Sequence, residues 1–121
     1  MKAGGKRLRP MLMQEMCRLF TGTLLEAVIP FMAAVEMIHT SSLVHDDLPC
    51  MDDDMMRRGK ASTWAEYGED IGVLTGDALM MYAFETAANA FETSIDPDEL
   101  SRIGRAMGIL ARKTGVYGMI G

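Results

Sequence analysis

The chain has 121 residues, enough for one modest domain, and its 49% hydrophobic and 24% charged residues are typical of a globular protein. Its formal net charge of -5 argues against a nucleic-acid surface, which would show clustered basic residues. Cys17 and Cys50 are too few for a disulfide scaffold or a zinc site, so we expect a cytoplasmic protein. The hydropathy pattern predicts neither a signal peptide nor a transmembrane segment.

Helix-prone residues dominate the chain and no alternating strand pattern appears, which predicts an all-α fold. Proline and glycine punctuate this pattern and separate the helices. We see no internal repeat and no boundary between domains. The predicted helices cover residues 10–20, 30–48, 63–67, 69–93 and 97–112.

Local signals mark several helix ends. Arg9 precedes Pro10 and is therefore biased away from helical geometry, so the residues before the proline are predicted to form a turn that leads into the first helix. Thr63 and Glu66 have the spacing of a capping box. Asp96, which a proline follows, is expected to cap the last helix.

Basic residues gather before the first helix, in the segment GGKRLRP from Gly4 to Pro10. Lys6, Arg7 and Arg9 would then lie beside a helix N-terminus, where free backbone N–H groups favour an anion. The segment therefore predicts a phosphate-binding turn. The alternative is a solvated basic terminus, which is the commoner fate of such runs.

The second predicted helix is largely apolar but carries a polar stripe. His39, Ser42 and Asp46 follow one another at spacings of three and four, so they share one face of the helix. A polar line on an apolar helix indicates either a solvent-facing side or the wall of a wet cavity. His39 taken alone is more typical of a satisfied structural histidine.

The densest charge in the chain follows that helix. Five aspartates crowd into nine positions and two arginines come directly after them, which is costly unless something compensates the like charges. A Mg²⁺ ion on the acidic side and an anionic ligand on the basic side would do so, because Mg²⁺ prefers one or two carboxylates together with phosphate oxygens. The residues are Asp46, Asp47, Asp52, Asp53 and Asp54, with Arg57 and Arg58.

Pro49 is expected to end the helix within this acidic run. The loop from Cys50 to Met56 can then turn Asp52 back towards Asp46, as a shared metal site requires. An EF-hand calcium loop is disfavoured, because a loop that starts at Asp52 has no Glu at its twelfth position. The two aspartates after Asp52 can be solvated bystanders.

A further motif, TGDAL, spans Thr75 to Leu79 in the fourth predicted helix. It places Asp77 among apolar neighbours. Most single polar residues in such helices bond a neighbouring element, and a role in substrate binding is the alternative.

Three motifs in this order and at these spacings point to one known family. GGKRLRP, the run DDLPCMD from Asp46 to Asp52 with RRG after it, and TGDAL together resemble the trans-type polyprenyl diphosphate synthases of the farnesyl and geranylgeranyl type. The resemblance implies the front part of the isoprenoid-synthase helical bundle, with helices around a central apolar cavity. Because the family's second aspartate-rich motif is absent, we expect residues 1–121 to be a single, partial synthase domain.

The resemblance also implies roles for particular residues. Magnesium ions would bridge Asp46, Asp47 and Asp52 to an allylic diphosphate, which Arg57 would contact as well. The residues expected to contact isopentenyl diphosphate are Lys6, Arg9, His39 and Arg58. The residues expected to act directly in catalysis are Asp46, Asp47 and Arg57.

By the same resemblance, the full enzyme would be a homodimer that condenses isopentenyl diphosphate with dimethylallyl, geranyl or farnesyl diphosphate into a short-chain polyprenyl diphosphate. Ser41 and Ser42 are small where farnesyl-making relatives often place an aromatic residue. We therefore hypothesise that geranylgeranyl length is accessible, with Met81 or Phe84 as a candidate floor of the tunnel. Replacing Ser41 by Tyr should then shorten the product.

Two other classes of protein are alternatives to an active synthase. A class I terpene cyclase also uses an aspartate-rich metal motif, although GGKRLRP has a purpose only if a second diphosphate binds. Alternatively, the chain is a non-catalytic subunit, or an inactive fragment that folds by association with another copy. Many apolar helical faces favour that second alternative for the isolated polypeptide.

Overall fold

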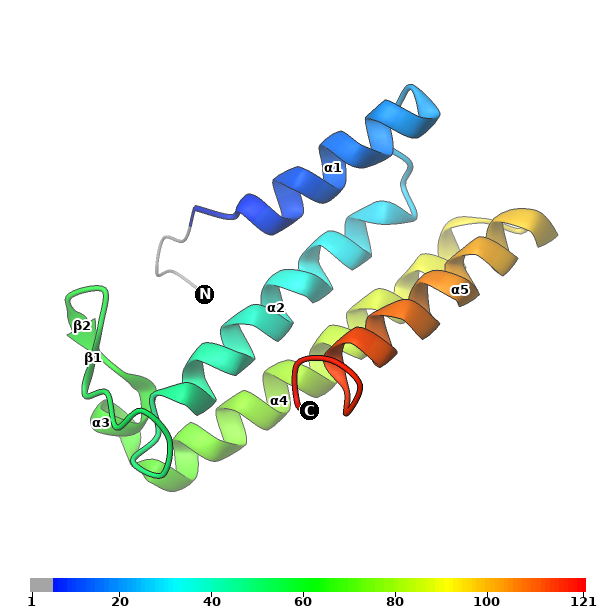
Figure 1. The fold of residues 1–121 in the computed structure, drawn as a ribbon. Coiled ribbons are helices and arrows are strands. Elements are labelled where there is room, and N and C mark those ends of the chain that lie inside the picture. The colour runs from blue at the N-terminus through cyan, green and yellow to red at the C-terminus, as the bar shows by residue number, and fades with distance from the viewer. Residues whose placement is uncertain (1–5) are drawn as a thin grey trace. The chain divides into compact units, whose positions relative to one another are not determined.

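The computed structural model describes residues 6–121, most of which are helical (Figure 1). The predicted all-α class is confirmed. The helices are α1 (Leu8–Thr21), α2 (Val28–Asp46), α3 (Thr63–Tyr67), α4 (Glu69–Ala88), the 3₁₀ helix η1 (Asn89–Thr93) and α5 (Pro97–Thr114). Two short strands, β1 (Met56–Arg57) and β2 (Lys60–Ala61), complete the fold.

The strands form an antiparallel hairpin that the sequence analysis did not foresee. Met56 pairs with Ala61 and Arg57 with Lys60, so only two residues make the turn. Arg58 (φ 51°) and Gly59 (φ 74°) both have left-handed backbones, as a type I′ hairpin turn requires. The usual sequence signal for this turn is Asn-Gly or Asp-Gly, and Arg-Gly does not give it.

The helix boundaries lie close to the predicted ones, with two instructive differences. Helix α1 begins at Leu8, so Arg9 is helical although it precedes Pro10. The proline is tolerated because the first N–H groups of a helix have no intrahelical partner to lose. The predicted helix over residues 69–93 ends earlier, since its last five residues form the tighter η1.

Of the two predicted caps, one is confirmed and one is wrong. The Asp96 carboxylate accepts a hydrogen bond from the Glu99 N–H at 3.2 Å, at the start of α5. The Thr63–Glu66 capping box does not form, because Ser62 rather than Thr63 is the N-cap of α3 and makes no side-chain cap bond. A Thr already inside the helix has lost the N-cap geometry that the box needs.

The chain divides into two compact units, whose boundaries fall inside α2 and α4 rather than in linkers. One unit is Met37–Phe84, and the other is Met1–Glu36 with Glu85–Gly121. The first unit carries the acidic run and the hairpin. The described residues of the second unit include α1 and α5.

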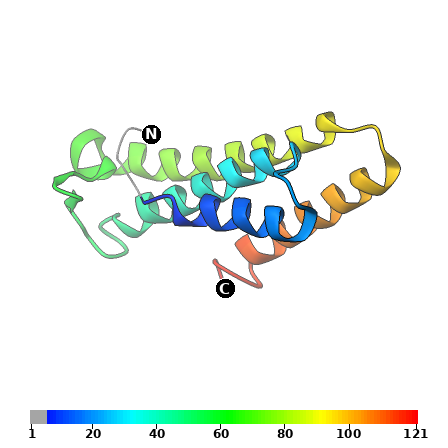
Figure 2. The ribbon, with the colours of Figure 1, turned by 90° about the horizontal axis from the view of Figure 1, so that it is seen from above.

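Within the Met37–Phe84 unit, α2 and α4 run side by side in opposite directions (Figures 1 and 2). The fully buried Ser41 donates its hydroxyl to the Gly76 carbonyl at 2.8 Å. One turn further along α2, His45 Nε2 lies 3.0 Å from the Val73 carbonyl oxygen. A Cβ at Gly76 would collide with the His45 ring, so glycine lets the two helices approach closely.

The other unit joins two segments that are far apart in the sequence. In α5, Ile103 and Thr114 are buried, and small Ala87 and Ala90 are fully buried near the end of α4 and in η1. Helix α1 has no buried residue among the described part of the chain. Its apolar side chains therefore contribute little to a core within this chain.

Helix α2 is long and apolar enough to cross a membrane by length and composition, although the sequence analysis expected no such segment. The core helix of a soluble protein passes the same test. We interpret α2 as a core helix, because Ser41 on it is fully buried against α4.

Candidate functional site

The loop after α2 folds back onto the helix end, as the sequence predicts. The N–H of Asp52 donates to the Asp46 carbonyl at 2.8 Å, and the N–H of Asp54 donates to the Asp47 carbonyl at 3.1 Å. Asp53, in a left-handed conformation (φ 54°), donates its N–H to the Leu48 carbonyl at 3.0 Å. Loop amides thus satisfy carbonyls that a helix C-terminus otherwise leaves unpaired.

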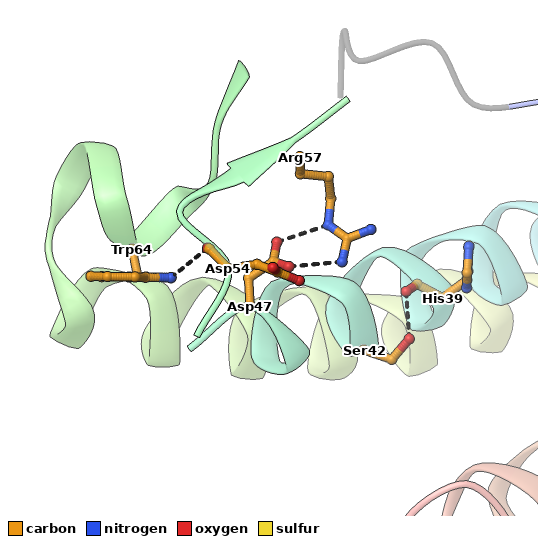
Figure 3. A network of polar contacts seen from close by, with 6 residues as sticks. All are labelled: His39, Ser42, Asp47, Asp54, Arg57 and Trp64. Atoms are coloured by element: carbon orange, nitrogen blue, oxygen red, sulfur yellow. Dashed lines mark hydrogen bonds and ion pairs between the residues drawn. The ribbon is translucent and has the colours of Figure 1, made fainter. Parts of the chain in front are cut away.

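Asp47, after the end of α2, and Arg57, in β1, form a bidentate ion pair (Figure 3). Arg57 Nε donates to Asp47 Oδ2 at 2.8 Å, and Nη2 donates to Oδ1 at 2.7 Å. The Asp47 side chain is 4% exposed and that of Arg57 34% exposed. The pair ties β1 to the C-terminal end of α2.

The hydrogen bonds that Arg57 donates to the Asp47 carboxylate raise the pKa of Arg57 above its ordinary value. Partial burial lowers the same pKa, but the charges of Asp47, Asp54 and Asp46 add to the upward shift. The guanidinium is therefore a permanent positive charge in an acidic surrounding.

Asp46 and Asp52 are the other two predicted metal ligands. Asp46 is half-buried at the last position of α2, and Asp52 is exposed in the loop. Within residues 6–121, no three side chains of His, Cys, Asp or Glu are grouped so as to hold a metal ion. The predicted set of three carboxylates is not preassembled, since both oxygens of Asp47 face Arg57.

Two of these aspartates lie at a helix end. Asp46 and Asp47 stand at the C-terminal end of α2, where the helix dipole already disfavours negative charge. The positive charge of Arg57 compensates the negative charge of Asp47. For the Asp46 carboxylate, the described part of the chain shows no hydrogen bond or ion pair, so this position is open to a cation.

Trp64 of α3 also contacts the loop after α2. Its indole Nε1 donates to the Asp54 carbonyl at 2.8 Å (Figure 3). The Ser62 N–H donates to the Met55 carbonyl at 2.9 Å. The Ser62 hydroxyl is buried and has no hydrogen-bond partner in the described structure. The sequence does not predict this role of Trp64, because an indole on a short helix gives no signal for a contact with a loop carbonyl.

The polar stripe of α2 contains residues in different surroundings. Ser42 donates its hydroxyl to the His39 carbonyl at 2.7 Å, and both residues are half-buried (Figure 3). Ser41, in contrast, is fully buried with its hydroxyl on the Gly76 carbonyl. The suggestion that position 41 lines a product tunnel stays a prediction, and an aromatic residue there would have to displace the Ser41 contact with α4.

Asp77 of the TGDAL motif lies close to a side chain of a neighbouring helix, in line with the structural alternative. Its Oδ1 lies 3.5 Å from His45 Nε2 on α2, and the Asp77 side chain is 63% exposed. His45 thus contacts both Asp77 and the Val73 carbonyl. These contacts give the motif a role in helix packing.

The basic segment at the start of the chain belongs to the other unit. Arg7 is the N-cap residue of α1 with a left-handed backbone (φ 49°), and Arg9 lies in the first helical turn. Lys6 and Arg9 are both exposed. The predicted placement of these cations beside a helix N-terminus is confirmed, while Gly4 and Gly5 of the motif lie outside the described residues.

Comparison with known proteins settles the family. The family model of the polyprenyl synthetases matches residues 1–115. The chain belongs to the polyprenyl synthetase family.

Several relatives match nearly the whole chain. It is 51% identical over 118 residues to the heterodimeric geranylgeranyl pyrophosphate synthase large subunit 1, chloroplastic, of Arabidopsis thaliana, covering 98% of the chain and 31% of that relative. The geranylgeranyl diphosphate synthase of Cyanophora paradoxa is 46% identical over 121 residues, which cover 100% of the chain and 39% of that relative.

A solved structure agrees with these relatives. The FPP/GFPP synthase of Zymomonas mobilis superposes with a TM-score of 0.86 at 39% identity, over 98% of this chain and 41% of that one. The chain thus spans 31% to 41% of the length of these three proteins.

Proposed function

We propose that this chain carries the allylic-diphosphate site of a prenyltransferase that condenses isopentenyl diphosphate with an allylic diphosphate. The supporting observation is the end of α2, where Asp46, Asp52 and the fixed Arg57 belong to one folded loop. Carboxylates for a divalent cation and a guanidinium for phosphate are the two partners that a metal-bridged diphosphate needs. The relatives are named as a geranylgeranyl pyrophosphate synthase subunit, a geranylgeranyl diphosphate synthase and an FPP/GFPP synthase.

The donor set at this loop fits magnesium. A Mg²⁺ ion keeps several waters and uses one or two carboxylates, and the half-buried Asp46 and the exposed Asp52 offer two. Asp52 is held near the helix end by its N–H bond to the Asp46 carbonyl. When bound, the ion would supply electrostatic stabilisation to the departing diphosphate.

We propose that different basic side chains contact the diphosphates of the two substrates. Arg57, fixed by Asp47, is proposed to contact the allylic diphosphate. Arg58 is exposed in the hairpin turn, and it is proposed to contact isopentenyl diphosphate. The other residues proposed for isopentenyl diphosphate are Lys6, Arg9 and His39.

The proposed reaction needs no side-chain base. The carbon–oxygen bond of the allylic diphosphate breaks, and the isopentenyl double bond attacks the resulting carbocation. The proton lost from the adduct passes to the departing diphosphate. The protein's task is to hold the two diphosphates, favour charge separation and exclude water, which would otherwise capture the cation.

The proposal is tested by incubating the chain with Mg²⁺, isopentenyl diphosphate and labelled dimethylallyl or geranyl diphosphate. Product extended by five-carbon units is expected, with Mg²⁺-dependent binding of geranyl diphosphate as a second readout. Asp46→Asn should lower product formation by about a hundredfold, the scale of losing one electrostatic contact to the transition state, and should also weaken the Mg²⁺-dependent binding. Asp53→Asn is the matched control, because the exposed Asp53 keeps its left-handed backbone readily as Asn. Full turnover by Asp46→Asn contradicts the proposal.

A second proposal concerns assembly. We propose that the protein is a homodimer, because α1 exposes large apolar side chains that need a partner surface. One relative is named as the large subunit of a heterodimeric synthase, which supports a subunit role as the second candidate function. Light scattering at micromolar concentration separates a dimer from a monomer. The exposed residues are Leu8, Met11, Leu12, Leu19 and Phe20.

The proposed compartment is the cytoplasm. Cys17 and Cys50 are both free thiols, which suits a reducing environment. A fluorescent fusion of the protein in its own cells tests this location.

A further inference from the structure

The contact between Asp47 and Arg57 changes the role that Asp47 has in the site. We propose that Asp47 is a positioning residue, which fixes Arg57 and the β1–β2 hairpin, and that it is not a magnesium ligand. The ligand side of this inference rests on the proposed function. The anchoring contact itself stands on the geometry alone.

The surroundings of Asp47 do not suit a Mg²⁺ ion. Both carboxylate oxygens accept hydrogen bonds from Arg57, and only 4% of the side chain is exposed. Mg²⁺ dehydrates reluctantly and keeps several waters, so its ligands must be reachable by a hydrated ion. Asp46, half-buried, and Asp52, exposed, meet that condition, whereas Asp47 does not.

The same contact leaves Arg57 prepared for a phosphate. Nε and Nη2 are bound to Asp47, while Nη1 makes no hydrogen bond within residues 6–121. One third of the side chain remains exposed. A guanidinium held at two of its nitrogens can present the third without first losing rotamer freedom.

The hairpin needs such an anchor. Two strands of two residues each are too short to be stable alone. The turn is also unfavourable, because Arg58 adopts a left-handed backbone that suits Gly, Asn or Asp. Arg57, at the base of this turn, ties the hairpin to α2 through Asp47.

The first experiment measures stability without metal or ligand. Trp64 is the only tryptophan and its indole bonds the Asp54 carbonyl, so its fluorescence reports on this loop. Asp47→Asn should shift the urea midpoint of the Trp64 signal to lower concentration. Asp53→Asn makes the same chemical change in the same loop, at an exposed position, and should leave the midpoint in place. Equal midpoints for the two variants would overturn the proposal.

A double-mutant cycle then assigns the effect to the contact. Arg57→Gln should shift the urea midpoint as Asp47→Asn does. The double variant should unfold at no lower urea concentration than the less stable of the two single variants. Additive shifts would show that the two side chains act independently, against the proposal. If Asp47→Asn does not fold, Arg57→Lys is used in its place, because lysine keeps the positive charge but cannot make the bidentate contact with Asp47.

The second experiment separates positioning from metal binding, with geranyl diphosphate and Mg²⁺ as probes in calorimetric titrations. Asp46→Asn should raise the half-saturating Mg²⁺ concentration about tenfold or more, as expected for loss of a charged contact. Asp47→Asn should leave that concentration unchanged and weaken geranyl diphosphate at saturating Mg²⁺ about tenfold, as Arg57→Gln does.

A higher Mg²⁺ requirement in Asp47→Asn, with normal affinity for geranyl diphosphate at saturating Mg²⁺, would overturn the inference. Failure of the unmodified chain to bind geranyl diphosphate would count against the proposed function instead. The ligand-free stability cycle still decides the anchoring role of Asp47 in that case.

Discussion

Helices α4 and α5 have similar lengths and the same glycine spacing, but their glycines have different surroundings. Gly72 and Gly76 of α4 are buried, and a Cβ at either would meet atoms of a neighbouring segment. Gly104 and Gly108 of α5 have nothing within 4 Å of an added Cβ in the described structure. The same four-residue spacing therefore marks a close helix crossing in α4 and open space in α5.

This difference shows where each helix gets its stability. Helix α4 depends on contacts from other elements, since His45 reaches its backbone and the Ser41 hydroxyl bonds its Gly76 carbonyl. Helix α5 buries Ile103 and Thr114, and it also has strong local signals at its N-terminus. Its Asp96 cap and the acidic residues of its first turn satisfy and complement its N-terminus.

The largest expected effect is at the helix crossing. Gly76→Ala should destabilise the Met37–Phe84 unit by about 3 kcal/mol, because the added methyl group collides with the His45 ring. Urea unfolding followed by Trp64 fluorescence measures this loss. Gly104→Ala is the matched control and should be neutral or stabilising by up to about 1 kcal/mol, as alanine suits an open helical position better. Similar losses in both variants would remove the distinction between the helices.

A smaller loss is expected at Gly72. A Cβ there would lie 2.9 Å from Leu48 Cδ2 and 3.0 Å from Trp64 Cβ, and the flexible leucine can shift. Gly72→Ala should therefore cost about 1 to 2 kcal/mol, less than the change at Gly76. The same unfolding assay, with Gly108→Ala as the control, ranks the two positions. An effect larger than that of Gly76→Ala would place the tightest approach elsewhere on α4.

The local cap of α5 gives the next prediction. Asp96→Ala removes the acceptor of the Glu99 N–H and should cost about 1 kcal/mol of helix stability. Asp96→Asn keeps a side-chain oxygen and should recover most of that loss. Thermal unfolding followed by far-ultraviolet circular dichroism measures both variants. No difference between Ala and Asn would mean that the hydrogen bond contributes nothing.

The smallest expected change is at Ser62. Its buried hydroxyl has no partner in the described structure, so Ser62→Ala should be neutral or should stabilise the protein by about 0.5 kcal/mol. Trp64 fluorescence during urea unfolding is again the measurement. A clear loss of stability would indicate that a bound water or another group satisfies this hydroxyl.

Much of the secondary structure could be predicted, because its signals are local. Pro97 with Asp96 marks the start of α5. The hairpin was not foreseen, since Arg58 stands where a turn of this type usually has Asn or Asp. Arg57, at the base of that turn, pairs with Asp47, and no short-range pattern reveals this contact.

The candidate site was predictable in its members but not in their partners. The density of charge identifies Asp46, Asp47, Asp52 and Arg57 as a group. The pairing of one aspartate with the arginine depends on the fold-back of the loop, which brings positions 47 and 57 together. Sequence spacing treats neighbouring carboxylates as equivalent, whereas burial distinguishes them.

The sequence by itself determined the all-α class, the approximate helix ends and the family motifs, because helix periodicity, proline stops and residue identity are properties of short segments. Tertiary structure decided which glycines serve as close crossings and which aspartate is neutralised by Arg57. Those outcomes depend on steric contact and electrostatics between residues far apart in the chain, such as His45 with Gly76, and are fixed only when the segments pack.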